Sequence, residues 1–269
     1  MNNYPNPLVS VLITTYNCQS TIISTLLSIC NQTFKDFEIV IIDDGSTDKT
    51  CKLIDDFKKN ISNINFTSCA HHGRYQSLSY GIEKSLGKFI AICDSDDLWS
   101  PQKLKLQTDL MLIKKLDFSL TDFNIIYSDF HTPLQTLKHD FNISFKLNLA
   151  KILTTPSILC HSSFMVKREL CSYSQLSSQL DLDIYLRLLD LNYQGMILKN
   201  KLVYKRVHEA QSFESKSNFK YRLNALKLQL PYIIKEKLFY VLIVRLFKLL
   251  IDLIPQKLRI LFKKFFKRK

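Results

Sequence analysis

The sequence predicts an α/β fold, in which a mostly parallel central sheet is flanked by helices and followed by a helical C-terminal extension. Two observations support this: short apolar runs alternate with helical stripes of apolar residues, and three of the apolar runs end in polar, acid-rich segments. Such alternation favours parallel strands joined by right-handed crossovers, and ligands then bind beyond the carboxyl ends of the strands. We therefore expect the three polar segments to face one site.

The first two strands and helices follow directly from the residue pattern. Residues 8–13 form an apolar run typical of a buried strand, and the polar residues 14–17 follow it. Residues 20–29 then carry apolar side chains at helical spacing. Residues 37–42 repeat the strand pattern, lead into the polar segment 43–48, and are followed by a second helical stripe.

A third apolar run, residues 89–93, ends in Asp94-Ser95-Asp96-Asp97. Clustered carboxylates at a strand end direct several oxygens to one point, which suits a hard cation that carries phosphate oxygens. An alternative stays open, because Asp97 or Ser100 could cap the helix that Pro101 begins.

These segments resemble the family 2 glycosyltransferases, whose Rossmann-like fold is called GT-A. The matching motifs are residues 10–17, 41–50 and 87–97, in this order and spacing, and a second region of resemblance covers residues 180–212. The resemblance implies inverting transfer of a sugar from a nucleoside-diphosphate donor, with a UDP-sugar favoured. The acceptor would be a glycan or a lipid-linked sugar in cell-surface polysaccharide synthesis.

The resemblance also assigns donor-binding residues, namely Thr15, Tyr16, Asn17, Asp43, Asp44, Asp94 and Ser95. An ionised carboxylate at Asp43 or Asp44 only accepts hydrogen bonds, so it would select a base that offers an N–H, as uracil does. Gly45 would permit the tight turn after these acids. The other interpretation of this segment is an ordinary turn in which Ser46 or Asp48 caps the next helix.

By the same resemblance, Asp181 is the catalytic base, and Asp96 and His208 bind a divalent metal, Mn²⁺ or Mg²⁺. Asp181 could instead be an acid favoured at a helix N-terminus, and His208 could be structural. Leu180 stands where the family has the first acid of a pair.

Leu78 and Ser79 stand where the family has Arg and Asn, so a cation for the diphosphate must come from Arg74 or from elsewhere. His71 and His72 are interpreted as surface-loop residues. His161 could contact the acceptor, but core packing is favoured, and we assign it no catalytic function.

The chain carries a formal charge of +13, and residues 233–269 hold eleven Lys and Arg against two acids. We expect a catalytic domain over residues 1–215 and a basic amphipathic helical tail over residues 216–269. Large apolar residues interleaved with Lys and Arg suit an anionic membrane surface and argue against nucleic acid. Packing on the catalytic domain or a dimer contact is the alternative.

Seven cysteines without a C-x-x-C motif indicate reduced thiols, and the polar segment 1–7 does not resemble a signal peptide. The expected location is therefore the cytoplasm, peripherally on the inner face of the cell membrane. Two other functions stay open: a nucleotidyltransferase, and a non-catalytic relative that binds a nucleotide sugar.

Overall fold

The computed structural model describes residues 6–59, 61–127, 144–175, 177, 179–207 and 218–253. The strands are β1 (Val9–Thr15), β2 (Phe37–Asp43), β3 (Ile64–Ser68), β4 (Phe89–Asp94), β5 (Leu98–Trp99), β6 (Phe118–Tyr127), β7 (Phe145–Lys146), β8 (Met165–Lys167) and β9 (Gly195–Val207). The α-helices are α1 (Ile22–Cys30), α2 (Thr50–Lys58), α3 (Arg74–Lys84), α4 (Lys103–Ile113), α5 (Leu149–Thr154), α6 (Leu180–Asp190), α7 (Asn218–Lys235) and α8 (Phe239–Leu253).

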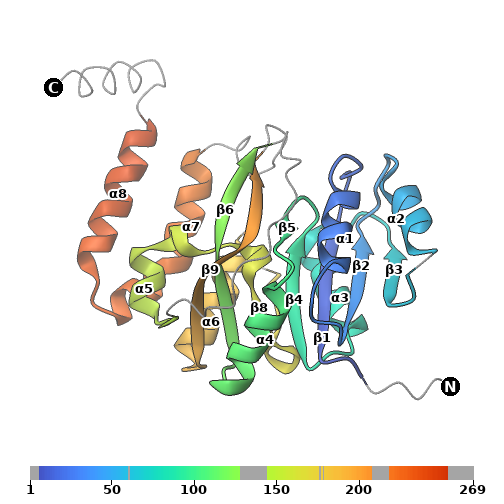
Figure 1. The fold of residues 1–269 in the computed structure, drawn as a ribbon. Helices are drawn as coiled ribbons and strands as arrows, with labels where there is room; N and C mark the ends of the chain where they lie inside the picture. The colour runs from blue at the N-terminus through green and yellow to red at the C-terminus, as the bar shows by residue number, and fades with distance from the viewer. Residues whose placement is uncertain are drawn as a thin grey trace, which may run out of the picture. The chain divides into compact units, whose positions relative to one another are not determined.

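The strands form one mixed sheet in the order β3-β2-β1-β4-β8-β6-β9-β5, and β7 pairs with β9. The pairs β3–β2, β2–β1, β1–β4 and β6–β9 are parallel, whereas β8 is antiparallel to both of its neighbours. The predicted α/β fold class, with a mostly parallel central sheet flanked by helices, is confirmed (Figure 1).

Both faces of the N-terminal sheet are covered, which explains why β1 reads as an unbroken apolar run. On one face of the sheet, Val11 and Ile13 belong to the same buried apolar cluster as Leu26 of α1. Leu12 points to the other face, against α3, where a Cβ at Gly81 would lie 2.2 Å from its Cδ1 atom. Glycine at this position therefore lets α3 approach β1 closely.

The chain divides into two compact units, one formed by residues 1–148 and 157–208 and the other by residues 149–156 and 209–269. The second unit contains α5, α7 and α8, so the predicted C-terminal helical extension begins with two helices. The predicted domain boundary at residue 215, and residues 254–269 of the predicted amphipathic tail, lie outside the described residues.

On α8, the side chains of Val241 and Leu249 are buried, whereas a larger apolar set is exposed. The exposed set comprises Phe239, Tyr240, Ile243, Val244, Leu246, Phe247 and Leu250. Within the described part of the chain, no helix combines the length and the apolarity needed to cross a bilayer.

Candidate active site

The carboxyl ends of β1, β2 and β4 lie next to one another, as their registers require. Thr15 pairs with Asp43 across β1 and β2, and Thr14 pairs with Asp94 across β1 and β4. Asp43 is also in register with Ser68 at the end of β3. The three polar segments identified in the sequence therefore meet at one edge of the sheet.

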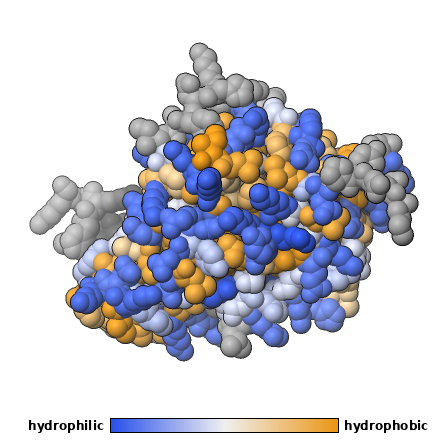
Figure 2. Space-filling model, turned by 90° about the horizontal axis from the view of Figure 1, so that it is seen from below, coloured by the Kyte–Doolittle hydropathy of each residue, from blue (hydrophilic) through white to orange (hydrophobic). Residues whose placement is uncertain are grey.

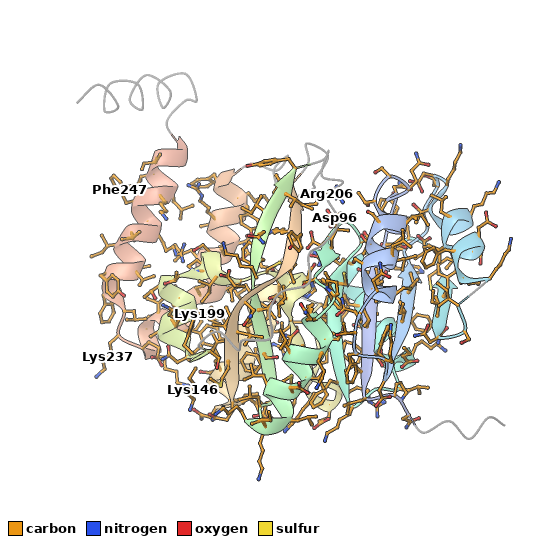
Figure 3. All side chains as sticks on the ribbon, viewed as in Figure 1. Asp96, Lys146, Lys199, Arg206, Lys237 and Phe247 are labelled. Carbon is orange, nitrogen blue, oxygen red and sulfur yellow. The ribbon has the colours of Figure 1, made fainter. Side chains whose placement is uncertain are left out.

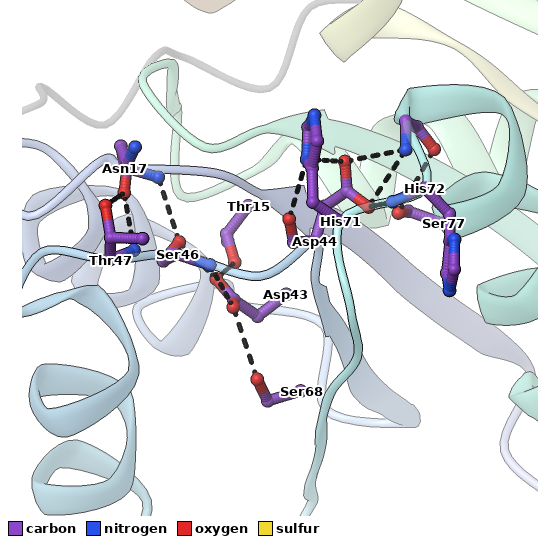
Figure 4. A network of polar contacts seen from close by, with 11 residues as sticks. Thr15, Asn17, Asp43, Asp44, Ser46, Thr47, Ser68, His71, His72 and Ser77 are labelled. Atoms are coloured by element: carbon purple, nitrogen blue, oxygen red, sulfur yellow. Dashed lines mark hydrogen bonds and ion pairs between the residues drawn. The ribbon is translucent and has the colours of Figure 1, made fainter.

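Asp43 is fully buried, and its carboxylate accepts hydrogen bonds from several elements (Figure 4). One oxygen accepts from the hydroxyls of Thr15 at 2.8 Å and Ser46 at 2.5 Å. The other accepts from the Ser46 N–H at 2.8 Å, the Cys51 thiol at 3.1 Å and the Ser68 hydroxyl at 3.3 Å. Burial opposes ionisation, but these hydrogen bonds, led by those from Ser46, outweigh it and lower the pKa of Asp43.

Asp44 organises the loop that leads into α3. Its carboxylate accepts from the backbone N–H groups of His72 at 2.9 Å and Gly73 at 3.0 Å, and it lies 3.0 Å from the Nδ1 atom of His71. Gly45 has a φ of +76°, and a Cβ there would lie 2.8 Å from the His71 backbone nitrogen. The predicted tight turn at Gly45 is thus confirmed, because no other residue fits this close approach in the left-handed region.

Tyr16 and Asn17 lie beyond the end of β1. The Tyr16 ring is 49% exposed and stacks on the His71 imidazole, with ring centroids 4.5 Å apart. The Asn17 carboxamide oxygen accepts from the backbone N–H groups of Thr47 at 2.8 Å and Asp48 at 3.3 Å. Tyr16 therefore offers an aromatic face to solvent, whereas the Asn17 side chain holds the turn after β2.

A second polar group surrounds the end of β4. The Arg74 guanidinium, at the start of α3, lies 2.6 Å from an Asp94 carboxylate oxygen and 2.8 Å from the Nδ1 atom of His161. The Ser162 hydroxyl accepts from the Asp94 N–H at 2.9 Å. Burial of Asp94 opposes its ionisation, but the Arg74 charge outweighs this and holds the pKa of that carboxyl below its usual range.

The acids after Asp94 divide into an enclosed one and a partly exposed one. Asp97 is buried and accepts from the Ser162 hydroxyl at 2.5 Å and from the Arg206 N–H at 2.8 Å. Burial, together with the charges of Asp94 and Asp96, raises the pKa of Asp97. Asp96 is partly exposed, and its backbone carbonyl oxygen accepts a hydrogen bond from the Arg206 Nε–H at 2.9 Å. Both residues are labelled in Figure 3.

The Ser95 carbonyl accepts from the hydroxyls of Thr21 at 3.0 Å and Thr25 at 3.1 Å, which fixes the Asp94–Asp97 loop to α1. This loop is therefore held on three sides, by α1, by Ser162 and by Arg206. Of the three acids in this loop, Asp94 and Asp96 are partly exposed and Asp97 is buried.

Asp181 lies in the first turn of α6. The charge of Asp94, and to a smaller extent those of Asp181 and Asp96, raises the pKa of the Arg74 guanidinium. The three acids predicted for the donor, the catalytic base and the metal are therefore electrostatic neighbours of one arginine. From the sequence, Arg74 is raised only as a replacement cation, and core packing is favoured for His161, with no catalytic function assigned to it.

The remaining predicted metal ligand, His208, lies outside the described residues. Within the described ranges, no group of three His, Cys, Asp or Glu side chains is arranged to hold a metal ion. The oxygen chemistry of Asp96 nevertheless suits Mn²⁺ or Mg²⁺, and phosphate oxygens of a donor are natural further ligands.

A cavity of about 470 Å³ lies away from these acids, among residues that include Leu8, Lys88 and Arg168. Leu8 immediately precedes β1, so this cavity belongs to the amino edge of the sheet. Figure 2 views the molecule from below, and hydrophilic and apolar residues are interspersed over that face.

Residues 10–173, more than half of the chain, match the family model described as glycosyl transferase family 2. A relative from Escherichia coli, the UDP-Glc:alpha-D-GlcNAc-diphosphoundecaprenol beta-1,3-glucosyltransferase WfaP, is 38% identical over 119 residues, which cover 44% of this chain and 47% of the relative. A second E. coli protein, chondroitin synthase, is 27% identical over 75% of this chain and 29% of its own length. The chain spans about half the length, or less, of the curated relatives it matches.

Solved structures share the fold. TarS residues 1–349 from S. aureus, in complex with UDP-GlcNAc, align with a TM-score of 0.66 at 20% identity, covering 84% of this chain and 66% of that one. The mannosyltransferase PcManGT from Pyrobaculum calidifontis, in complex with GDP-Man and Mn²⁺, aligns with a TM-score of 0.62 at 17% identity, covering 87% and 65%. The predicted GT-A type of fold is thereby confirmed, and the chain belongs to glycosyl transferase family 2.

Proposed function

We propose that this protein is an inverting glycosyltransferase that moves a sugar from a nucleoside-diphosphate donor, a UDP-sugar, to a glycan or lipid-linked acceptor in cell-surface polysaccharide synthesis. The observation that carries the proposal is the Arg74–Asp94 ion pair at the carboxyl edge of the sheet, together with the charges of Asp181 and Asp96, which also raise the pKa of Arg74. Family membership supports the same reaction type.

In the proposed reaction, Asp181 removes the proton from an acceptor hydroxyl, which then attacks the anomeric carbon of the sugar in a single displacement. Asp96 and His208 would hold a divalent cation, Mn²⁺ or Mg²⁺, which neutralises charge on the departing nucleoside diphosphate. Arg74 is suited to a second position on that diphosphate, because a guanidinium offers several N–H donors in a fixed plane.

For the nucleoside, Tyr16 offers an exposed ring on which a base can stack. The proposal assigns five further residues to the same nucleotide site, namely Thr15, Asn17, Asp43, Asp44 and Ser95. Asp44, which is 5% exposed, is the less enclosed of the two acids, because Asp43 has no exposure. A carboxylate acceptor favours uracil over bases that lack an N–H at the matching position. The glucosyl donor in the name of the relative WfaP is a uridine nucleotide, which agrees with this preference.

The acceptor and the location belong to the same proposal. The relative WfaP is named for a diphosphoundecaprenol acceptor, which is lipid-linked. The exposed apolar side chains of α8 and the eleven Lys and Arg of residues 233–269 would bind an anionic membrane surface. The protein would then work at the cytoplasmic face of the cell membrane.

The direct test is incubation of the purified protein with a panel of nucleotide sugars and Mn²⁺ or Mg²⁺, with detection of released nucleoside diphosphate. Release from one UDP-sugar supports the proposal. Pyrophosphate release from a nucleoside triphosphate and a sugar phosphate would identify a nucleotidyltransferase instead. Binding without turnover over a broad acceptor panel would identify a non-catalytic relative.

The metal role is tested with Asp96→Ala by titration calorimetry of UDP in the presence of Mn²⁺. We expect the metal-dependent part of the UDP affinity to fall, because the carboxylate ligand is lost. Asp109→Ala is the matched control, since Asp109 lies on α4 in an ion pair with Lys105. Unchanged affinity in Asp96→Ala would remove Asp96 from the metal site.

The membrane role is tested by flotation with vesicles that contain anionic lipid. The double variant Ile243→Asp/Phe247→Asp places charge on the exposed face of α8 without changing its buried residues. Partitioning should fall in the variant and in vesicles of neutral lipid. Equal partitioning of variant and wild type would exclude α8 as the membrane contact.

A further inference from the structure

His161 is a buried histidine that connects the charged groups of the site to a buried tyrosine. It lies in a short helical turn, His161–Ser163, and is only 5% exposed. Its Nδ1 atom lies 2.8 Å from the Arg74 guanidinium and 3.3 Å from an Asp94 oxygen. Its Nε2 atom lies 2.8 Å from the Tyr173 hydroxyl. Both ring nitrogens therefore have polar partners on opposite sides.

The chemistry of these partners selects one protonation form of the ring. A guanidinium only donates hydrogen bonds, so the nitrogen closest to Arg74 must accept. The Nδ1 atom is then unprotonated, and the proton of the neutral imidazole sits on Nε2, from which it is donated to the Tyr173 oxygen. The longer contact between Nδ1 and Asp94 would need a proton on Nδ1, which the shorter contact with Arg74 excludes.

Tyr173 is suited to hold the ring in this state. The phenol is 7% exposed, and burial raises its pKa well above the usual value, so it stays neutral. The two rings pack edge to face, with centroids 5.8 Å apart and an interplanar angle of 72°. Hydrogen bond and ring packing together fix the orientation of the imidazole.

The contacts of His161 link two parts of the chain that the proposed reaction uses together. Arg74 and Asp94 belong to the donor side of the site, whereas Tyr173 lies in the segment that leads into α6, whose first turn carries Asp181. The Arg74 side chain remains 51% exposed, and the contacts with Asp94 and His161 both use its Nη2 atom.

We propose that His161, as the neutral tautomer with its proton on Nε2, is a positioning residue that holds Arg74 and Asp94 in the arrangement that receives the donor diphosphate. This inference rests on the proposed function. His161 itself does not contact the sugar or the leaving group. It accepts a hydrogen bond from Arg74 and is oriented by Tyr173, so it acts through these neighbours.

Two substitutions separate the two ring nitrogens. In His161→Asn, the side-chain oxygen can accept from Arg74 near the former Nδ1 position, whereas in His161→Gln the amide N–H can reach Tyr173 near the former Nε2 position. We expect His161→Gln to weaken UDP binding and to raise the donor KM by about 10-fold or more, the usual loss when an outer partner of a site ligand is removed. His161→Asn should retain most of the affinity, and kcat should change less than KM in both.

Tyr173→Phe should produce a smaller loss of UDP affinity, because it removes only the acceptor for the Nε2 proton. Tyr185→Phe is the matched control, since Tyr185 is another fully buried tyrosine close to the site and lies on α6. Equal UDP affinity and KM in wild type, His161→Gln and Tyr173→Phe would overturn the inference. Failure of the wild type to bind any nucleoside diphosphate would instead contradict the proposed function.

The tautomer gives a readout that does not depend on activity. Nitrogen NMR of the ¹⁵N-histidine-labelled wild type, which has six histidines, distinguishes a ring with its proton on Nε2 from one protonated on Nδ1 or on both. Either His161→Asn or His161→Gln identifies the signal by its loss. A proton on Nδ1 at neutral pH would overturn the inference.

Discussion

The two acidic loops at the carboxyl edge use the same residue type in opposite ways. At the end of β2, every oxygen of Asp43 is occupied by protein donors, and the side chain has no exposure. At the end of β4, Asp94 is 29% exposed and its counter-ion Arg74 is 51% exposed. In the first loop the protein itself satisfies the charge of Asp43, whereas in the second loop Asp94 and Arg74 both stay partly exposed. An acid-rich sequence alone therefore does not distinguish an enclosed carboxylate from one that a ligand can reach.

The largest effect on activity is expected for Asp181→Asn. If Asp181 is the base, the rate of sugar transfer should fall by about two to four powers of ten, while UDP affinity stays within a few-fold. The measurement is steady-state transfer together with calorimetry. Transfer that persists within a few-fold would reassign Asp181 to a role at the helix N-terminus.

On the structural side, Asp43→Ala should destabilise the fold by about 2–4 kcal/mol, because several buried donors lose their acceptor. Asp96→Ala should change stability by less than about 1 kcal/mol, since Asp96 is partly exposed. Urea unfolding of both variants measures the contrast. Similar losses in both would show that the two loops do not differ in this way.

The lowered pKa of Asp43 adds a pH signature to that contrast. A carboxyl whose pKa is lower in the folded state than in the unfolded state stabilises the fold at pH values above its unfolded-state pKa of 3.8. This contribution is lost as the pH falls from 3.8 through the lower pKa of the folded state. The stability difference between wild type and Asp43→Ala should therefore shrink in acid. A difference that is constant down to pH 2 would exclude ionisation as its source.

Lys103 extends the comparison to an enclosed cation. It is buried, its ammonium lies 3.7 Å from the centroid of the Trp99 ring, and burial lowers its pKa to about 7. Between pH 7 and 10.5, Lys103 is protonated in the unfolded state, where its pKa is 10.5, but has lost its proton in the folded state. The free energy of unfolding should therefore rise over this range by up to about 1.4 kcal/mol per pH unit. Lys103→Met should remove this slope, and an unchanged slope would show that Lys103 is not its source.

The smallest effect is expected from Tyr185→Phe. Within the part of the chain that the structure describes, the buried Tyr185 hydroxyl has no hydrogen-bond partner. Its removal should leave stability unchanged or raise it by up to about 1 kcal/mol, because an unsatisfied buried oxygen is lost. Thermal unfolding checks this, and a clear loss of stability would reveal a partner for that hydroxyl.

The sheet and the meeting of its polar ends could be predicted, because both depend on local pattern. Apolar runs mark β1, β2 and β4, and parallel pairing then brings Thr15, Asp43 and Asp94 to one edge. The hydrogen-bond partners and the burial of each acid could not be predicted in this way. The donors that enclose Asp44 come from residues 71–73, and the contact of Arg74 with His161 joins positions 87 residues apart. No spacing rule reports such long-range contacts.

The second unit has a consequence for how the chain can be shortened and made. Residues 149–156 belong to it, although residues on both sides of them belong to the first unit. In this unit α5 packs on α7, with Leu149, Ile152 and Leu153 buried. During synthesis, the partner helix of α5 is therefore complete only after residues 155–235 have emerged. A chain cut after residue 207 would remove a helix that α5 packs on, so partial versions of this protein should either keep α7 or replace the apolar face of α5.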